Sequence, residues 1–166
     1  MADAASGVAI EEGLDSDEVL FRSVRPDDVK IEAAEWHLSV TAFNDRNRQP
    51  SVDRAAIRPN PADSRKEGSH GIVELLTGEV RTKVHVVMNP GAPPKQQQEY
   101  KVDVFARPIP EDNPDHLPAN PAHAQIETAP TFRSNEHFNK LKDKLCRLAE
   151  RRGFRIVPVG VTVNAP

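Results

Sequence analysis

Fifteen prolines spread through 166 residues are the strongest constraint on how this chain can fold. Proline has no backbone N–H and a fixed φ, so it favours turns, loops, sheet edges and the first turn of a helix. Aromatic residues are few, and hydrophobic residues make up 37% of the sequence. The composition therefore predicts a single domain with a core of modest size and with much turn and loop.

The clearest regular element is a helix over "SNEHFNKLKDKLCRLAERRG", residues 134–153. One face is apolar at helical spacing, and it consists of Phe138, Leu141, Leu145 and Leu148. Ser134 or Asn135 can cap the start, and Gly153 can end the helix. This pattern predicts one main amphipathic helix near the C-terminus.

Short apolar or alternating runs predict strands at 17–24, 36–43, 71–76, 84–88, 100–106 and 154–163. Pro158 lies inside the last run, which favours an edge position for that strand. We therefore expect an α+β fold, in which the main helix packs on a mixed or antiparallel sheet.

The ends of the chain and its middle differ in composition from the rest. Residues 1–17 are small and acidic and contain no Lys or Arg, which predicts a disordered acidic leader before a domain over 18–166. "NPGAPPKQQQE", residues 89–99, is typical of a flexible insertion. The leader does not have the pattern of a signal peptide, and no apolar run is long enough to span a membrane.

Charge and cysteine usage exclude several classes of protein. The formal net charge of −3 argues against a chain that coats nucleic acid. The single Cys146 excludes an internal disulfide and a cysteine-based zinc site, and it suits a reducing, cytoplasmic compartment. Its place beside Leu145 in the predicted helix favours packing over nucleophilic chemistry.

"PSVDRA", residues 50–55, can be read in two ways. In a strand, Ser51 and Asp53 would share one face; in a helical turn, Ser51 would be the N-cap and Asp53 would lie in the first turn. The functional hypothesis is that Asp53 orients Arg54, or that Arg54 binds an anion such as phosphate.

Two further residues are candidates for a site. Arg22 in "LFRSVRP" would point with Leu20 and Val24 toward the core, where its guanidinium needs a partner, for which Asp53 is a candidate. His123 in "NPAHAQI" is either a hydrogen-bonded structural histidine or a general acid or base. The six histidines show no metal-ligand spacing, and no P-loop, Rossmann or G-x-S-x-G motif is present, so no metal or cofactor is predicted.

Three stretches, "LFRSVRPDDV", "SVTAFNDRNRQPSVDRA" and "NPAHAQI", together resemble a group of short uncharacterised bacterial proteins. The shared pattern is Leu-x-Arg-x-Val/Ile-x-Pro, then Ser-x-x-Ala-Phe with Ser-Val-Asp, then Asn-Pro-Ala-His-Ala, and it spans about residues 19–126. The resemblance implies a bacterial, cytoplasmic, single-domain protein and supplies no activity. It also implies one recurring constellation, made of Arg22, Ser39, Phe43, Ser51, Asp53, Asn120, Pro121 and His123.

Two functions of different classes follow, and whether the chain is an enzyme stays open. The first is a small accessory or binding module that acts with a partner protein, in a defence or toxin–antitoxin type of system. The second is a nucleotide- or RNA-directed enzyme, a nuclease or an NAD-type transferase. In it His123 would transfer protons, Arg22 and Arg54 would neutralise phosphate, and Ser51 or Ser39 would position the substrate. Convergence of these side chains on one open pocket would favour the enzyme, whereas burial with mutual hydrogen bonds would count against it.

A basic stripe on the predicted helix is the last candidate binding surface. It consists of Lys140, Lys144, Arg147 and Arg151, which follow i, i+4, i+7 and i+11. The stripe is either an ordinary solvated face or a docking surface for an anionic partner. Because the acidic leader would compete for it, we expect weak binding of nucleic acid or none.

Overall fold

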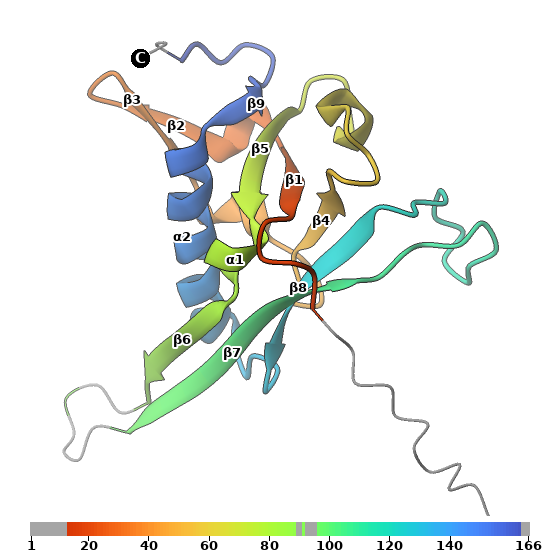
Figure 1. Cartoon of the computed structure of the whole chain (residues 1–166). Coiled ribbons are helices and arrows are strands. Elements are labelled where there is room, and N and C mark those ends of the chain that lie inside the picture. The colour runs from red at the N-terminus through yellow and green to blue at the C-terminus, as the bar shows by residue number, and fades with distance from the viewer. Residues whose placement is uncertain (1–12, 89–90, 92–95, 164–166) are drawn as a thin grey trace, which may run out of the picture.

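A seven-stranded antiparallel sheet in the order β6-β7-β8-β4-β1-β5-β9 is the centre of the fold (Figure 1). This computed structural model describes residues 13–88, 91 and 96–163. The strands of the sheet are β1 (Val19–Val24), β4 (Ser51–Arg54), β5 (Gly71–Leu76), β6 (Thr82–Val87), β7 (Gln97–Ala106), β8 (His123–Ala129) and β9 (Phe154–Ile156). A separate hairpin joins β2 (Val29–Glu32) to β3 (Glu35–Leu38). The helices are α1 (Thr77–Val80), α2 (Asn135–Arg152), and the short 3-10 helices η2 (Pro26–Asp28), η3 (Val40–Phe43) and η4 (Pro61–Ser64).

The predicted α+β class is confirmed, and every strand pairing in the sheet is antiparallel. The predicted main helix is α2. The Ser134 hydroxyl accepts a hydrogen bond from the backbone N–H of His137, and Gly153, at φ 88°, follows the last turn. Among the described residues, no helix is long and apolar enough to cross a membrane.

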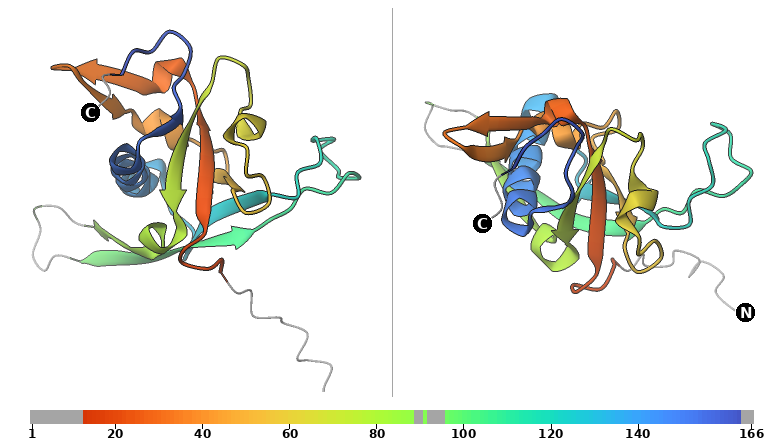
Figure 2. Two further views of the ribbon diagram at one scale, coloured as in Figure 1. Left: turned by 45° about the horizontal axis from the view of Figure 1, so that its top comes forward. Right: turned by 90° about the horizontal axis from the view of Figure 1, so that it is seen from above.

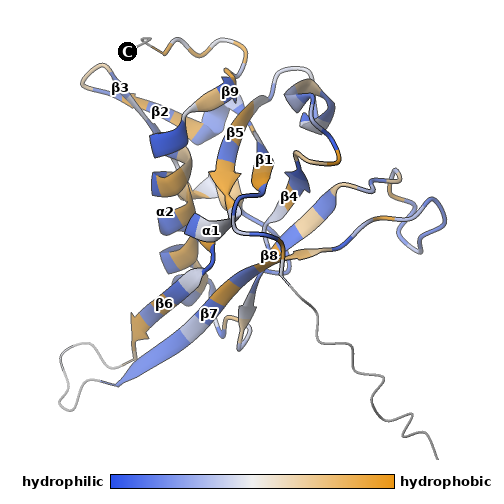
Figure 3. Cartoon of the chain, in the orientation of Figure 1, coloured by the Kyte–Doolittle hydropathy of each residue, from blue (hydrophilic) through white to orange (hydrophobic). Residues whose placement is uncertain are grey.

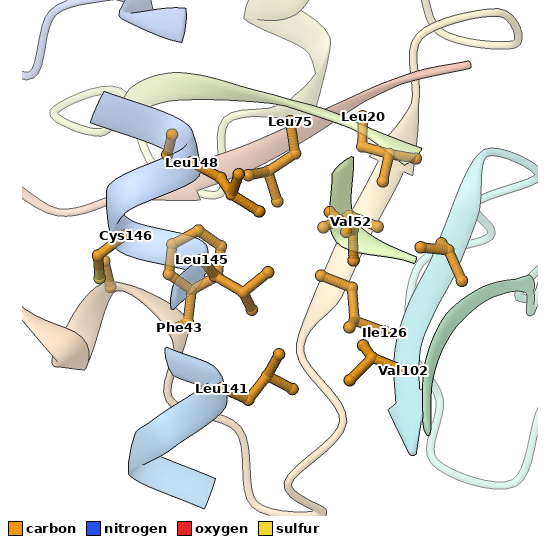
Figure 4. Close-up of a cluster of buried hydrophobic side chains, with 14 of the residues drawn as sticks. Leu20, Phe43, Val52, Leu75, Val102, Ile126, Leu141, Leu145, Cys146 and Leu148 are labelled. Carbon is orange, nitrogen blue, oxygen red and sulfur yellow. The ribbon is translucent and has the colours of Figure 1, made fainter. Parts of the chain in front are cut away.

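The core lies between α2 and one face of the sheet (Figure 4). The helix contributes three buried leucines, Leu141, Leu145 and Leu148. The sheet contributes apolar residues to the same cluster, namely Leu20, Val52, Leu75, Val102 and Ile126. Hydrophobic and hydrophilic residues are interspersed along α2 (Figure 3), as expected for a helix with one buried face. Burial of this apolar surface is the main stabilising term of the fold.

Two predicted strands are shorter than the sequence indicated. In the run at 36–43, the strand ends at Leu38. The Ser39 hydroxyl then caps η3, and the chain turns beneath α2. The run at 154–163 ends as a strand at Ile156. Pro158 packs against Gly71 there, where an added Cβ would lie 2.5 Å from a proline ring carbon. The edge position predicted for this last strand is confirmed.

Part of the predicted leader packs on the domain. Leu14 is buried, and its backbone N–H donates to the carbonyl of Val104. The Arg81 guanidinium pairs with Asp103 and donates to the carbonyl of Leu14 and to the hydroxyl of Ser16. Residues 1–12 of the leader lie outside the described residues. So does most of the predicted insertion at 89–99, whose residues 97–99 belong to β7.

Replacing Leu145 by Ala tests the core. Because this side chain is fully buried between α2 and the sheet, the change should lower the free energy of unfolding by about 2–5 kcal/mol. Val159 is 64% exposed, so Val159→Ala is the matched control and should change stability by less than about 0.5 kcal/mol. Urea denaturation measures both, and similar losses for the two variants would contradict this account of the core.

Candidate functional site

"PSVDRA" forms strand β4 and does not begin a helical turn. β4 lies between β1 and β8, and Asp53 is opposite Phe21 on one side and His123 on the other. Val52 points into the core beneath α2. Since side chains alternate along a strand, Ser51 and Asp53 face the other side of the sheet.

That second face of the sheet carries a pocket of about 310 Å³. Its walls come from the sheet, from the segment 58–66 that contains η4, and from residues 107–120, which we call the arm. The segment 58–66 and the arm lie on the opposite side of the sheet from α2 (Figures 1 and 2). Five of the predicted site residues line this one pocket: Arg22, Ser51, Asp53, Asn120 and His123.

Asp53 ties the arm to the sheet. Its carboxylate accepts a hydrogen bond of 2.8 Å from the Asn120 side-chain amide and one of 3.3 Å from Arg58. The Asn120 side-chain oxygen in turn accepts from the backbone N–H of Ala122. Asp53 is 9% exposed, so these bonds supply the partners that a buried carboxylate needs. Arg58, not Arg54, is therefore the arginine that pairs with Asp53.

The orientation of His123 follows from its two ring nitrogens. Nδ1 lies 2.7 Å from the carbonyl oxygen of Arg107, which can only accept, so Nδ1 carries a proton. In the neutral ring Nε2 then presents its lone pair to the Ser51 hydroxyl, at 3.2 Å. The same hydroxyl lies 3.3 Å from a carboxylate oxygen of Asp45. This arrangement leaves Nε2 as the position at which His123 can accept or release a proton beside the pocket.

Arg22 lines the pocket from β1, and its guanidinium is directed to backbone. It donates to the carbonyls of Ala42 (2.9 Å), Asn44 (3.1 Å) and Ser51 (2.7 Å). The residue is 7% exposed, and its guanidinium lies over the Phe43 ring. Burial lowers the pKa of Arg22, while the carboxylates of Asp45 and Asp28 raise it. The partners of this inward arginine are thus carbonyls of the 42–51 segment and not Asp53.

The other predicted residues lie outside the pocket. Arg54 pairs with Glu18 at 2.5 Å. Ser39 caps η3, and its carbonyl accepts from the Cys146 thiol below α2. Cys146 is buried, which raises the pKa of its thiol to about 12 and agrees with the expected packing role.

The predicted basic stripe is divided. Lys144 donates to the Thr82 hydroxyl, and Arg147 donates to the carbonyl of Leu38 and pairs with Glu150 at 2.7 Å. Lys140 and Arg151 are exposed. Docking of an anionic partner on this stripe stays a prediction.

Five residues of segment 58–66 line the pocket although the sequence did not single them out: Arg58, Asp63, Ser64, Arg65 and Lys66. Arg58 donates to Asp53, whereas the Lys66 ammonium makes no hydrogen bond or ion pair with any other described residue. Burial lowers the pKa of Lys66, and the positive charge of Arg22 lowers it further. The Ser64 hydroxyl, also in the pocket wall, is buried and unpartnered within the described part of the chain. The only signal in the sequence was the density of polar residues in this loop.

The described residues contain no group of three His, Cys, Asp or Glu side chains placed to hold a metal ion. Comparisons of the chain with known protein families, with curated proteins and with solved structures found no match. The function must therefore be argued from the pocket itself.

Replacing Arg22 by Met tests the support of the pocket. The change leaves three carbonyls without their donor, and at about 1 kcal/mol each it should lower the free energy of unfolding by about 3 kcal/mol or more. Arg46 lies in the same segment and is exposed, so Arg46→Met is the control and should cost less than about 0.5 kcal/mol. Chemical denaturation measures both, and equal midpoints would show that Arg22 does not hold this segment.

Proposed function

We propose that this protein binds a small dianionic ligand of the phosphate-ester class in the pocket over β1, β4 and β8. The observation that carries the proposal is the charge of the lining. Four cationic residues line the pocket against two aspartates, which leaves a surplus of two positive charges in a chain whose net charge is −3. The cations are Arg22, Arg58, Arg65 and Lys66, and the aspartates are Asp53 and Asp63.

Lys66 is the residue that gains most from such a ligand. Although the residue is exposed overall, burial lowers the pKa of its ammonium, and the like charge of Arg22 adds to this effect. A lowered lysine pKa means that the charged form is less stable in the folded protein than in water. A phosphate group carries a charge of about −1.5 to −2 at neutral pH, and it would offset this cost.

The neutral polar groups support the same ligand. The Ser64 hydroxyl at the pocket wall lacks a partner among the described residues, and a buried hydroxyl without one costs free energy. The Ser51 hydroxyl and His123 line the same pocket. The pocket volume of about 310 Å³ falls at the lower end of the range for small-molecule sites, roughly 300–1,000 Å³.

The variant Lys66→Met separates binding from stability. We expect the affinity for inorganic phosphate, measured by calorimetry at low ionic strength, to fall about tenfold or more, because one charge-assisted contact is lost. The thermal midpoint should change little, because Lys66 is exposed and its ammonium has no partner among the described residues that the change would remove.

Lys140→Met is the matched control, because Lys140 is an exposed lysine on α2 outside the pocket. It should leave both the phosphate affinity and the midpoint unchanged. Absence of saturable phosphate binding to the unmodified protein, or an equal loss in the two variants, would contradict the proposal.

Catalysis on the bound ester is a second candidate, and the oriented imidazole favours it. His123 is held through Nδ1 by the Arg107 carbonyl, so Nε2 can take a proton from a nucleophile or give one to a leaving group. Arg58 and Lys66, in place of Arg22 and Arg54, would then offset the phosphate charge. Action with a protein partner in a bacterial defence system stays a prediction.

Replacing His123 by Gln tests this second candidate. Gln can keep a hydrogen bond to Ser51 but cannot exchange protons near neutral pH, so the variant should fold and bind phosphate with unchanged affinity. Any hydrolysis of phosphate esters should fall by about 10²–10⁴-fold. If hydrolysis by the unmodified protein and by His123→Gln is the same, His123 is not the acid or base.

A further inference from the structure

The apolar half of the pocket comes mainly from the arm. Ile109, Leu117 and Pro118 line the pocket from the arm, and Phe21 lines it from β1. The cations reach the same space from segment 58–66. The pocket therefore joins a cationic wall to an apolar wall, and a bare phosphate ion would use only the first.

Leu117 is held in place while its side chain is open to solvent. Its exposed fraction is 49%, so its apolar surface is available to a ligand. The Asn113 side chain accepts a hydrogen bond from the N–H of Leu117 at 2.9 Å, and it donates to the carbonyls of Leu117 (2.8 Å) and Pro110 (2.9 Å). A single exposed leucine is ordinary in proteins, but one whose backbone is fixed by two such bonds at the edge of a pocket is preorganised for contact.

The base of the arm is fixed as well. Ile109 and Asn120 exchange two backbone hydrogen bonds of 2.9 Å, which close the arm into a loop with one narrow stem. The Asn120 side chain anchors that stem to Asp53. The apolar wall thus has a defined position relative to the cations, and a ligand that spans both walls loses little free energy to ordering of the protein.

We infer that the ligand is a phosphate monoester that carries a single aromatic or aliphatic group, with the phosphate at Lys66 and Arg58 and the apolar group against Leu117. This inference rests on the proposed function. The pocket volume of about 310 Å³ suits one ring with its phosphate and is too small for a whole dinucleotide, which disfavours the NAD-type donor considered from the sequence.

Calorimetric titrations with inorganic phosphate, phenyl phosphate and phenol test the inference. Phenyl phosphate should bind about 10- to 100-fold more tightly than inorganic phosphate, since a buried ring adds the transfer free energy of an apolar side chain. Leu117→Ser should remove most of this advantage and leave the affinity for inorganic phosphate unchanged. Leu117→Met, which keeps an apolar side chain of similar volume, should retain it.

Ile31→Ser is the matched control, because Ile31 is 53% exposed and lies on the β2–β3 hairpin outside this pocket. It should not alter any of the affinities. If phenyl phosphate binds no more tightly than phosphate, or if Leu117→Ser keeps the full advantage, this inference fails while the proposed function stands. If phenol binds as tightly as phenyl phosphate, or if neither ester nor phosphate binds, the proposed function fails with it.

Discussion

The position of the pocket depends on the three hydrogen bonds that Arg22 donates to backbone carbonyls. Ala42, Asn44 and Ser51 are the acceptors, so one side chain of β1 holds the segment that enters β4. Arginine stays charged even where burial lowers its pKa, and its planar fork can meet several oxygens at once. Without these bonds, the segment that leads into β4 would not be held in place, and Ser51 and Asp53 would not keep their register against β8.

Side chains along β4 alternate between the two faces of the sheet, and the two faces differ in chemistry. Val52 joins the core under α2, while Ser51 and Asp53 turn to the opposite face, beside Phe21 and His123. Most polar groups on this face satisfy one another: Asp53 with Asn120 and Arg58, and His123 with Arg107 and Ser51. The polar centre therefore stabilises the fold and at the same time shapes the floor of a pocket.

Two polar groups of the pocket have no partner among the described residues, and both support the proposed ligand. One is the Lys66 ammonium, whose pKa burial lowers, and the other is the buried Ser64 hydroxyl. Proteins tolerate such local costs at functional sites, where a bound ligand offsets them. Leu117 is the apolar counterpart of these polar groups. The arm fixes its backbone while its apolar side chain stays partly exposed to solvent, where a ligand could cover it.

Local periodicity could be read from the sequence alone, and the 3.6-residue period of Leu141, Leu145 and Leu148 predicted α2. For residues 51–54 the sequence left a strand and a helical turn open, and the structure shows the strand, which places Ser51 and Asp53 on one face. The resemblance implied one constellation of eight residues, and five of them line the pocket: Arg22, Ser51, Asp53, Asn120 and His123. Ser39, Phe43 and Pro121 are not among the lining residues.

Only the tertiary structure decided which partners these residues meet. Asp53 pairs with Arg58 and not with its neighbour Arg54. The acceptors of Arg22 are backbone carbonyls, which every residue has, so the residue types do not reveal them. Lys66 lines the pocket, and its backbone N–H donates to the Ser23 hydroxyl of β1. Periodicity is a local property that can be read along the chain. The choice among distant partners depends on strand order and register, which the packing of the whole sheet against α2 sets.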